Sequence, residues 1–543
     1  MDEERLRNPL HWTTSDVLSF QARTQPDKIA VQFLEGGAHT YADIWLRTRA
    51  VAAGLAAHGI QAGDKIAVLL SNGLEYCETW WGSHLAGCVL VPVNTELVGK
   101  LLANVLNLSE ARMIVVEADY LPRLEAIRDQ LPSLEFVVTV GSGPESADGL
   151  PWQLLAFESL RGAPDRAPAP QAKFSDLACL MFTSGTTGPS KAVMMPHAHL
   201  YLFGLVTLDT LDLTGEDTYY VTLPLFHANG MLLQTYACLI AGAKAVIRKK
   251  FSASNWIRDI SECRATHTNF LGVMAEFIDQ QPSSAFDTNH ELRVICAAPA
   301  APKYVERFKK RFGVGMTEGY GMSEVNTPLM SPLQGAVPGS CGKVYDRYFE
   351  VRIADPETDL ELPPDTPGEI QVRPKQAFGF MTGYYRQPGK TVEAWRNLWF
   401  HTGDLGRMDS DRNFYFIDRL KDCIRRRGEN VSAYEVETVL MDYPLVTDAA
   451  AVAIASEIDG GEDEILAVLV TENELDPFDL LDHCWKNLPK YAVPRFFRFI
   501  TADEMPRTAT NKIRKSELRE IGVSGNTWTA TQEQPPARDT GTA

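Results

Sequence analysis

The chain has 543 residues, of which 45% are hydrophobic and 22% charged, a composition typical of a globular protein with room for several domains. Its 52 basic and 70 acidic residues give a formal net charge of −18, which argues against broad nucleic-acid binding because such binding needs a basic face. No stretch approaches the roughly 18 uninterrupted apolar residues of a membrane span.

The N-terminus and the cysteines indicate a cytoplasmic protein. The first five residues, Met1-Asp2-Glu3-Glu4-Arg5, are acidic where a secretory signal is basic, and no apolar segment follows them. The nine cysteines are dispersed, without CxxC pairs or histidines at zinc spacing. An odd, scattered set favours reduced thiols over a disulfide framework.

The first predicted elements form an α/β pattern. Thr40-Tyr41-Ala42-Asp43 resembles a capping box that opens an amphipathic helix, which stops at Gly59. Residues 65–70 and 88–93 read as strands on either side of a helix over residues 74–85. Strand, helix and strand at this spacing predict a crossover connection and a parallel sheet. Further strands are predicted at residues 113–116, 136–140, 178–182 and 293–297.

The later part of the chain changes character. Residues 141–173 are rich in Pro, Gly and Ala and read as a linker within the large domain, whereas residues 348–373 alternate like β-strands. Strands at 449–455 and 465–471 and a helix at 480–488 then suggest a small α+β domain. The predicted fold is α/β, with an N-terminal domain of α/β subdomains plus a β-rich portion (1–419), a small C-terminal α+β domain (420–523) and a disordered tail (524–543).

The strongest local signal is a polar loop that follows an apolar strand, Met181-Phe182-Thr183-Ser184-Gly185-Thr186-Thr187-Gly188-Pro189-Ser190-Lys191. Glycines allow close backbone approach, so successive N–H groups can converge on phosphate oxygens. The pattern is neither the Walker loop nor the Rossmann fingerprint, and a bare Ser/Thr/Gly surface turn is the alternative. We predict phosphate contacts from Thr183, Ser184, Gly185, Thr186, Thr187, Gly188 and Lys191.

This loop resembles the signature of the adenylate-forming superfamily, which contains acyl-CoA synthetases, peptide-synthetase adenylation domains and luciferases. The family usually has proline directly before the lysine, whereas here Ser190 stands between Pro189 and Lys191. That departure bears on the path of the loop and not on its chemistry. Six further segments follow in the family's order, so the resemblance covers about residues 20–520.

Two of these segments imply contacts to adenine and to a metal. Gly319-Tyr320-Gly321-Met322-Ser323-Glu324 resembles the family motif in which a tyrosine stacks on adenine and a serine reaches the α-phosphate. The resemblance makes Glu324 a ligand of Mg²⁺, for which a carboxylate is a suitable hard donor. Ala297-Ala298-Pro299 matches the small strand end that lies along the adenine ring. Taken alone, these residues form a turn beside a solvated acid and an uninformative tripeptide. The implied nucleotide contacts are Ala297, Ala298, Pro299, Tyr320, Gly321, Met322 and Ser323.

The next two segments resemble the ribose motif and the domain junction. In His401-Thr402-Gly403-Asp404 the resemblance implies that Asp404 accepts hydrogen bonds from both ribose hydroxyls. In Asp418-Arg419-Leu420-Lys421-Asp422 it implies that Arg419 also binds the ribose and that Lys421 lies at the hinge of a mobile C-terminal domain. A lone Asp after Gly is more often a turn former, and a charged linker is often simply exposed.

Two C-terminal segments complete the series. In the family, the loop equivalent to Arg425-Arg426-Arg427-Gly428-Glu429-Asn430-Val431-Ser432 enters the site for thiol transfer, and its glycine lets pantetheine pass. The resemblance assigns Arg425, Gly428 and Glu429 to coenzyme A, whose phosphates suit the arginine cluster. Pro506-Arg507-Thr508-Ala509-Thr510-Asn511-Lys512-Ile513 resembles the motif of the catalytic lysine, here Lys512. As bare charge runs, both would be solvated faces.

The acid-binding pocket is harder to read. Leu223-Pro224-Leu225-Phe226-His227 matches a family segment whose aromatic residue or histidine closes over the carboxylate, and residues 227–231 are expected to line or border the pocket. A purely structural histidine is an equal alternative for His227. The segment 428–437 most resembles the crotonobetaine/carnitine–CoA ligase subfamily, but nothing in the sequence identifies the acid.

The resemblance implies an ATP-dependent acyl-CoA ligase. Such an enzyme forms an acyl-adenylate and pyrophosphate, then transfers the acyl group to coenzyme A and releases AMP, with Lys512, Glu324, His227 and Lys191 as catalytic residues. The expected cofactors are ATP, Mg²⁺ and coenzyme A, and the partner is a small carboxylic acid, with no nucleic acid and no transmembrane segment. A homodimer is left open.

Three other functions are alternatives to that of an acyl-CoA ligase. A stand-alone adenylation enzyme that loads a carrier protein is the main one, although only about 30 residues follow Lys512, too few for a carrier domain. A luciferase-like oxygenase is disfavoured because no residue pattern indicates oxygen chemistry and the final Gly-Thr-Ala is no peroxisomal signal. A non-catalytic nucleotide sensor would not need Glu324, Asp404, Arg419 and Lys512 together.

Overall fold

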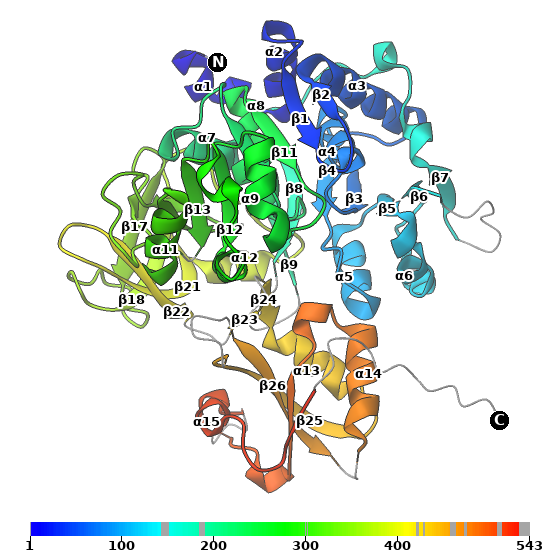
Figure 1. The fold of residues 1–543 in the computed structure, drawn as a ribbon. Helices are drawn as coiled ribbons and strands as arrows, with labels where there is room; N and C mark the ends of the chain where they lie inside the picture. The colour runs from blue at the N-terminus through cyan, green and yellow to red at the C-terminus, as the bar shows by residue number, and fades with distance from the viewer. Residues whose placement is uncertain are drawn as a thin grey trace. The chain divides into compact units, whose positions relative to one another are not determined.

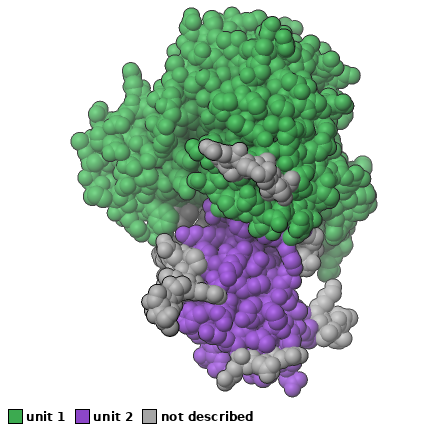
Figure 2. Space-filling view, turned by 90° about the vertical axis from the view of Figure 1, so that its right-hand side faces the viewer, with its two compact units in different colours: residues 1–95, 106–183, 192–418 green, residues 96–105, 184–191, 419–543 purple. Residues whose placement is uncertain are grey.

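A computed structural model describes residues 2–142, 151–183, 190–298, 300, 302–419, 423–426, 429–456, 463–471, 475–507 and 513–530. The chain divides into two compact units, coloured separately in Figure 2. Unit 1 comprises residues 1–95, 106–183 and 192–418, and unit 2 comprises residues 96–105, 184–191 and 419–543. No helix in the described ranges is both long enough and apolar enough to cross a membrane.

The first sheet of unit 1 has eight strands, and it contains the predicted crossover. β3 (Lys65–Leu69) leads through α4 (Leu74–Leu85) into β4 (Val89–Pro92), and the two strands pair in parallel. The capping box of α3 (Tyr41–Ala57) is confirmed, because Thr40 and Asp43 exchange hydrogen bonds. The order of the sheet is β19 (Gly383–Tyr384), β9 (Lys191–Pro196), β8 (Leu177–Thr183), β4, β3, β5 (Met113–Glu117), β6 (Phe136–Val140) and β7 (Gln153–Ala156).

β7 lies inside the stretch predicted as a linker, so part of that interpretation is wrong. Gln153 to Ala156 pair in parallel with β6, which gives this otherwise aperiodic segment the hydrogen-bond partners that local sequence cannot supply. The side chain of Trp152, directly before the strand, is buried. Pairing with an existing strand edge therefore orders a segment whose composition alone indicates a loop.

The second sheet of unit 1 has nine strands and is mostly parallel. Helices α9 (Ala253–Glu262) and α11 (Pro302–Phe312) lie over β12 and β13 (Figure 1), with α10 (Gly272–Asp279) in the same layer. Trp256, Phe270 and Phe308 form the aromatic centre of that interface. The order is β16 (Lys343–Val344), β15 (Asn326–Met330), β14 (Met316–Met322), β13 (Val294–Ala298), β12 (His267–Leu271), β10 (Thr218–Val221), β11 (Lys244–Ile247), β1 (Ile29–Phe33) and β2 (Ala38–Thr40).

A third, antiparallel sheet confirms the β-like alternation predicted over residues 348–373. β17 (Phe349–Ala354) pairs with β18 (Gly368–Pro374), which pairs with β21 (Trp399–Met408). β20 (Trp395–Arg396) and β22 (Phe414–Arg419) complete this sheet. The remaining helices are α1 (Glu3–Arg7), α2 (Thr14–Thr24), α5 (Gly99–Ser109), α6 (Leu121–Glu125), α7 (His197–Thr210), a π-helix (Asn229–Tyr236), α8 (Ala237–Ala241) and α12 (Pro388–Ala394).

Unit 2 is built on a four-stranded sheet that is covered on both faces (Figure 1). Its strands are β25 (Val446–Ile454), β26 (Glu464–Thr471), β27 (Phe496–Ile500) and β28 (Thr527–Thr529). Alternate residues of β25 point to opposite faces, so Ala449 and Ala451 meet α13 (Ala433–Met441) and α14 (Pro477–Asn487), whereas Ala450 and Val452 meet α15 (Lys515–Ile521). A hairpin of β23 (Cys423–Arg426) and β24 (Glu429–Ser432) precedes α13.

The expectation of a disordered tail from residue 524 is wrong at its start. Residues 527–529 form β28, antiparallel to β27, and the Trp528 ring packs against Phe478 and Phe497 at centroid distances of 5.2 and 5.6 Å. A polar composition predicts disorder, but one indole that fills a hydrophobic site overrides it. Residues 531–543 lie outside the described part of the chain.

Candidate active site

Several predicted nucleotide contacts lie at the carboxyl ends of parallel strands, where open α/β sheets bind their ligands. β13 ends at Ala297 and Ala298, which pair with Phe270 and Leu271 of β12. Ala297 is buried and Ala298 is half-buried, so the strand ends in a face without bulky side chains. Just beyond Pro299, which is not described, the backbone N–H of Ala300 donates to Glu318 of β14 at 3.0 Å.

The hairpin of β14 and β15 fixes Tyr320 and requires Gly321. A Cβ on Gly321 would lie 2.3 Å from the carbonyl oxygen of Asn326, closer than any side chain allows. Asn326 itself has a φ of 72°, the left-handed region that lets the chain reverse so tightly. The backbones of the two strands therefore approach each other closely at this point. Tyr320, the residue before Gly321, is held in a buried position.

Glu324 lies in the turn of this hairpin and is only 4% exposed. Its Oε1 accepts a hydrogen bond from the Tyr384 hydroxyl at 3.0 Å, and its carbonyl oxygen accepts from the backbone N–H of Met381 at 3.2 Å. The ring of His199 bridges the same two segments, because its nitrogens lie 2.8 Å from the Ser323 carbonyl oxygen and 3.1 Å from that of Gly379. The carboxylate is thus oriented by a segment 60 residues away.

Electrostatics at this contact favour a neutral tyrosine that donates. Burial raises the pKa of the Tyr384 hydroxyl well above its ordinary value, and the neighbouring Glu324 carboxylate raises it further. Burial also lowers the pKa of His199 to about 4, so its ring is neutral at physiological pH. Tyr384 therefore keeps its proton and donates a hydrogen bond to Glu324.

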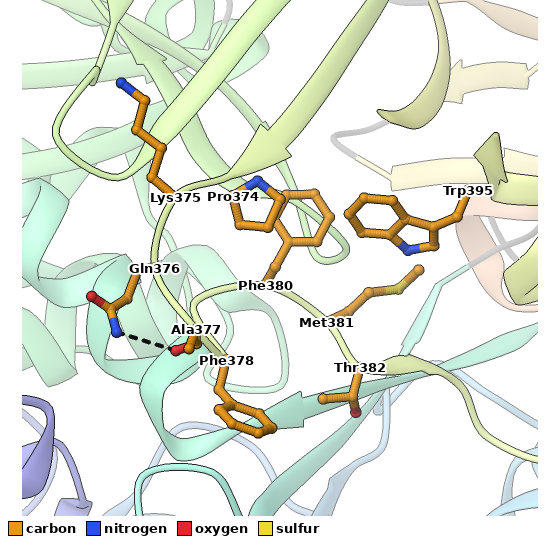
Figure 3. A pocket seen from close by; sticks show the side chains of 9 residues that line it. All are labelled: Pro374, Lys375, Gln376, Ala377, Phe378, Phe380, Met381, Thr382 and Trp395. Atoms are coloured by element: carbon orange, nitrogen blue, oxygen red, sulfur yellow. Dashed lines mark hydrogen bonds between the residues drawn. The ribbon is translucent and has the colours of Figure 1, made fainter. Parts of the chain in front are cut away.

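An aromatic cluster anchors the segment that carries Met381 and Tyr384. Phe380 packs on Trp395 and Phe400 at centroid distances of 5.2 and 5.7 Å. Beside it lies a pocket of about 270 Å³, into which Phe380, Met381 and Trp395 face while Lys375 points away (Figure 3). None of the lining residues is a predicted site residue, although one of them, Met381, contacts the Glu324 turn through its backbone N–H.

Asp404 is the second buried carboxylate, and it meets Tyr320 directly. The Tyr320 hydroxyl donates to Asp404 Oδ2 at 2.7 Å, which joins β14 of one sheet to β21 of another. Gly403 has a φ of 72°, and the backbone N–H of Asp404 donates to Thr402 Oγ1 at 3.1 Å. The structure therefore brings together the residues predicted for adenine and for ribose.

A buried contact between a carboxylate and a histidine supports the turn before Asp404. The Glu369 carboxylate lies 2.6 Å from His401 Nδ1 and accepts the backbone N–H of Gly403 at 3.0 Å. Burial by itself would raise the pKa of Glu369, but the contacts with His401, Gln371 and Gly403 outweigh it and the pKa is lowered. Glu369 is thus ionised and holds the left-handed glycine in place.

Phe416 of β22 also borders Tyr320, with near-parallel rings at an interplanar angle of 25° and a centroid distance of 6.3 Å. Its side chain is 45% exposed, which is unusual for a phenylalanine. An aromatic face of this kind beside Tyr320 is suited to a flat heterocycle. Phe416, Glu369 and Tyr384 cannot be recognised from the sequence, because their contacts join strands far apart in the chain.

The segment with His227 is held by Asn72 and Tyr76, which come from the turn before α4 and from α4 itself. The Asn72 side chain donates to the Leu223 carbonyl oxygen and accepts from the Leu225 N–H, and the Tyr76 hydroxyl donates to the Leu225 carbonyl oxygen. The His227 ring is half-buried and lies 4.6 Å from the Phe226 ring, centroid to centroid. The histidine is therefore placed on a rigid loop after β10.

Only the edges of the predicted phosphate loop are described. Thr183 ends β8 and Lys191 begins β9, whereas residues 184–189 lie outside the described part of the chain. Within unit 2 the Ser190 hydroxyl donates to Glu435 Oε1 at 2.5 Å. The residue that departs from the family pattern thus contacts the beginning of α13.

The arginine cluster is only partly available to a ligand. Arg426 is buried, its Nε pairs with Glu464 Oε2 at 2.7 Å, and its Nη1 donates to the carbonyl oxygens of Tyr491 and Val493. The interpretation of all three arginines as counter-charge for coenzyme A is therefore wrong for Arg426, which stabilises unit 2. The backbones of Arg425 and Asn430 lie opposite each other in the β23–β24 hairpin, and Glu429 is half-buried. Gly428 and Lys421 are outside the described residues.

The two ends of the segment with Lys512 come together in unit 2. Arg507 and Ile513 form an antiparallel bridge, and the backbone N–H of Arg514 donates to the Pro506 carbonyl oxygen at 2.8 Å. Arg507 is also paired with Asp448 of β25. Lys512 itself lies outside the described residues, and Arg419 is the last residue of β22.

Comparison with known proteins agrees with this geometry. The profile of the AMP-binding enzyme family matches residues 18–385, and that of the AMP-binding enzyme C-terminal domain matches residues 435–512. Crotonobetaine/carnitine–CoA ligases of Salmonella typhimurium and Salmonella paratyphi B are 30% identical, over 85% of this chain and 89% of theirs.

Solved structures resemble the whole chain. The o-succinylbenzoate CoA synthetase of Bacillus subtilis, a double mutant bound with a product analogue, aligns with a TM-score of 0.79 at 25% identity, covering 94% of this chain and 98% of that one. MatB of Rhodopseudomonas palustris, bound to ATP, aligns with a TM-score of 0.66 at 26% identity, covering 93% and 98%.

Proposed function

Because the chain belongs to the AMP-binding enzyme family and is an ATP-dependent acyl-CoA ligase, we propose that Tyr320, Glu324 and Asp404 form the nucleotide end of its active site. The observation that carries this proposal is the buried Tyr320–Asp404 hydrogen bond, whose tyrosine stands four residues before the buried Glu324. Two carboxylates are costly to bury unless ligands or donors compensate their charge. A nucleotide with its metal provides both.

Different residues of the proposed site contact different parts of the nucleotide. Tyr320 offers its ring to adenine, beside the small face of Ala297 and Ala298 and the exposed ring of Phe416. Asp404 accepts from the ribose hydroxyls, aided by Arg419. The loop of residues 183–188 and Lys191 bind the phosphates, and Gly321, Met322 and Ser323 also contact the nucleotide.

Glu324 fits a magnesium ion. Its carboxylate is a hard, anionic oxygen donor, and no group of three or more candidate ligands occurs among the described residues. Mg²⁺ is commonly held by one or two carboxylates together with substrate phosphates, which agrees with a single protein carboxylate here. When bound, the ion would neutralise charge on the phosphate oxygens.

The reaction joins an acid to a thiol in two steps. A carboxylate oxygen of the acid attacks the α-phosphorus of ATP, and the bond to pyrophosphate breaks. Lys512 stabilises the charge that develops at the α-phosphate, while His227 closes over the reacting carboxylate. The sulfur of coenzyme A then attacks the acyl carbon, and AMP leaves with the bonding electron pair.

Unit 2 serves the two steps with two different segments. Lys512 acts in the first step, whereas Gly428, Arg425 and Glu429 guide the thiol in the second, with Lys421 at the hinge. This exchange needs a hinge-type rotation of the C-terminal domain. We propose that this domain begins at residue 420 and extends past the predicted end at residue 523, because β28 (Thr527–Thr529) belongs to its sheet. We also propose that the enzyme works in the cytoplasm.

The acid must be identified by measurement. Relatives at 25–30% identity are named for different acids, crotonobetaine or carnitine in one case and o-succinylbenzoate in another. The test is a panel of carboxylic acids assayed for AMP release with and without coenzyme A, with products identified by mass. We expect coenzyme A to accelerate AMP release and an acyl-CoA to form. Acyl transfer only to a phosphopantetheinylated carrier protein would contradict the second step.

A further inference from the structure

A chain of buried amide side chains lies beside the loop of His227. The Asn229 Oδ1 accepts two hydrogen bonds, one from Gln234 Nε2 at 3.0 Å and one from Asn269 Nδ2 at 2.8 Å. Asn269 Oδ1 in turn accepts from the Tyr219 hydroxyl at 2.5 Å. Gln234, Asn269 and Tyr219 are all buried, whereas Asn229 is half-buried.

This arrangement fixes which end of the Asn229 amide is available. An amide oxygen has two lone pairs, and both are occupied here. The two N–H groups of Asn229 Nδ2 have no acceptor among the described residues. Asn229 is therefore held as a hydrogen-bond donor that points away from its own network.

A second polar atom of this network also lacks a hydrogen-bond partner among the described residues. Gln234 Oε1 is buried and has no hydrogen-bond partner in the described part of the chain. An unsatisfied buried polar group costs about 1–3 kcal/mol, so a network that served packing alone would be expected to close on itself. A network left open beside a site is more consistent with a missing ligand.

The position of Asn229 agrees with such a ligand. Asn229 follows His227 by two residues and begins a π-helix (Asn229–Tyr236), an element that often occurs at functional sites. Its partner Asn269 lies in β12 opposite Cys296 of β13, two residues before Ala298. Asn229 is thus tied to the carboxyl edge of the sheet on which the candidate site lies.

We infer that Asn229 selects the acid by donating Nδ2 to an uncharged oxygen on the acid's chain. Asn269, Gln234 and Tyr219 position the amide, and none of them is cationic, which favours a hydroxyl, ether or carbonyl oxygen over a second carboxylate. The inference rests on the proposed function, because it names the class of acid bound at that site. A donor that loses its acceptor in a buried site typically reduces binding about 10- to 100-fold.

The test uses pairs of acids that differ only by an oxygen in place of a methylene, or by a hydroxyl in place of hydrogen. For the wild type we expect kcat/KM for acyl-CoA formation to be at least about tenfold higher for the oxygen-bearing member of the best pair. Asn229→Asp keeps the shape and the accepting oxygen but removes the N–H donors. The KM for the oxygen-bearing acid should therefore rise, and the preference for that acid over its oxygen-free partner should disappear. The KM for ATP should not change.

Two further variants make the outcome decisive. Asn229→Leu should equalise or reverse the preference, and Asn289→Leu, at an exposed asparagine, should leave it unchanged. The inference is overturned by an equal oxygen-to-methylene ratio in wild type and Asn229→Asp, or by a wild-type preference for acids without an acceptor. Failure of every acid to form an acyl-CoA would instead reject the proposed function itself.

Discussion

Glu324 and Tyr384 illustrate how a single contact prepares a residue for a charged ligand. The tyrosine donates to one carboxylate oxygen, and the aromatic cluster around Phe380 keeps the tyrosine in place. A carboxylate oriented in this way loses little side-chain entropy when it binds a metal. Two substitutions separate the charge of Glu324 from its orientation.

Glu324→Gln should lower acid-dependent exchange between pyrophosphate and ATP at least about tenfold, because a neutral amide replaces an anionic ligand of the same shape. That factor corresponds to roughly 1.4 kcal/mol of transition-state stabilisation. The measurement is a Mg²⁺ titration of the exchange rate, with the exposed Glu357→Gln as control. A normal rate and an unaltered titration would remove Glu324 from the site.

Tyr384→Phe should raise the Mg²⁺ concentration needed for half-maximal exchange about fivefold and change the saturated rate much less. The reason is the loss of one hydrogen bond to a charged partner, worth about 1 kcal/mol or more. Tyr385→Phe is a matched control, because that neighbouring hydroxyl donates to Glu110 instead. Direct binding of Mn²⁺–ATP, followed by the paramagnetic signal of the ion, should weaken in parallel. An equal effect of both variants would argue against the positioning role.

Among the elements, those with local signals are predictable from sequence and those with distant partners are not. The capping box of α3 depends on Thr40 and Asp43, three residues apart, and the alternation of β17 and β18 is visible in the chain. β7 and β28 were missed because each depends on an existing strand. The motif residues of the candidate site could be recognised in order, but Tyr384, Glu369 and Phe416 could not, because they act through contacts across 32 to 96 positions.

Trp528→Ala tests whether the packing of β28 stabilises unit 2. The indole packs on Phe478 and Phe497, so its removal should destabilise unit 2 by about 2–4 kcal/mol, the range of large-to-small substitutions in cores. The readout is thermal melting together with protection of the β27 amides from hydrogen exchange. Val523→Ala, at an exposed residue of the same region, should change neither. Unaltered protection of β27 in Trp528→Ala would contradict a structural role for β28.

At the scale of the whole molecule, the proposed mechanism assigns different steps to different segments of unit 2. The segment of Lys512 is closed at its base by the Arg507–Ile513 bridge, and the β23–β24 hairpin brings residues 426 and 429 opposite each other. Each segment is therefore framed by its own backbone contacts. A change in one need not disturb the other.

Lys512→Ala should abolish acid-dependent exchange between pyrophosphate and ATP but still convert a presynthesised acyl-adenylate to the thioester at near the wild-type rate. Gly428→Leu should do the reverse, because a bulky side chain obstructs the thiol and leaves ATP untouched. Both half-reactions are measured on one preparation of each variant, with folding checked by thermal melting. If both folded variants lost both half-reactions equally, the two-segment mechanism would be untenable.

The hydrogen bond between Tyr320 and Asp404 has a consequence for unfolding as well as for binding. It spans 84 residues and joins strands of two different sheets, so the nucleotide site that we propose draws on both sheets. A bound nucleotide would therefore act as a non-covalent cross-link that must be released before the sheets separate. At an ATP concentration of 100 times Kd this linkage adds about 2.7 kcal/mol to the free energy of unfolding. The cell's own nucleotide pool would then protect the folded enzyme from proteases between turnovers.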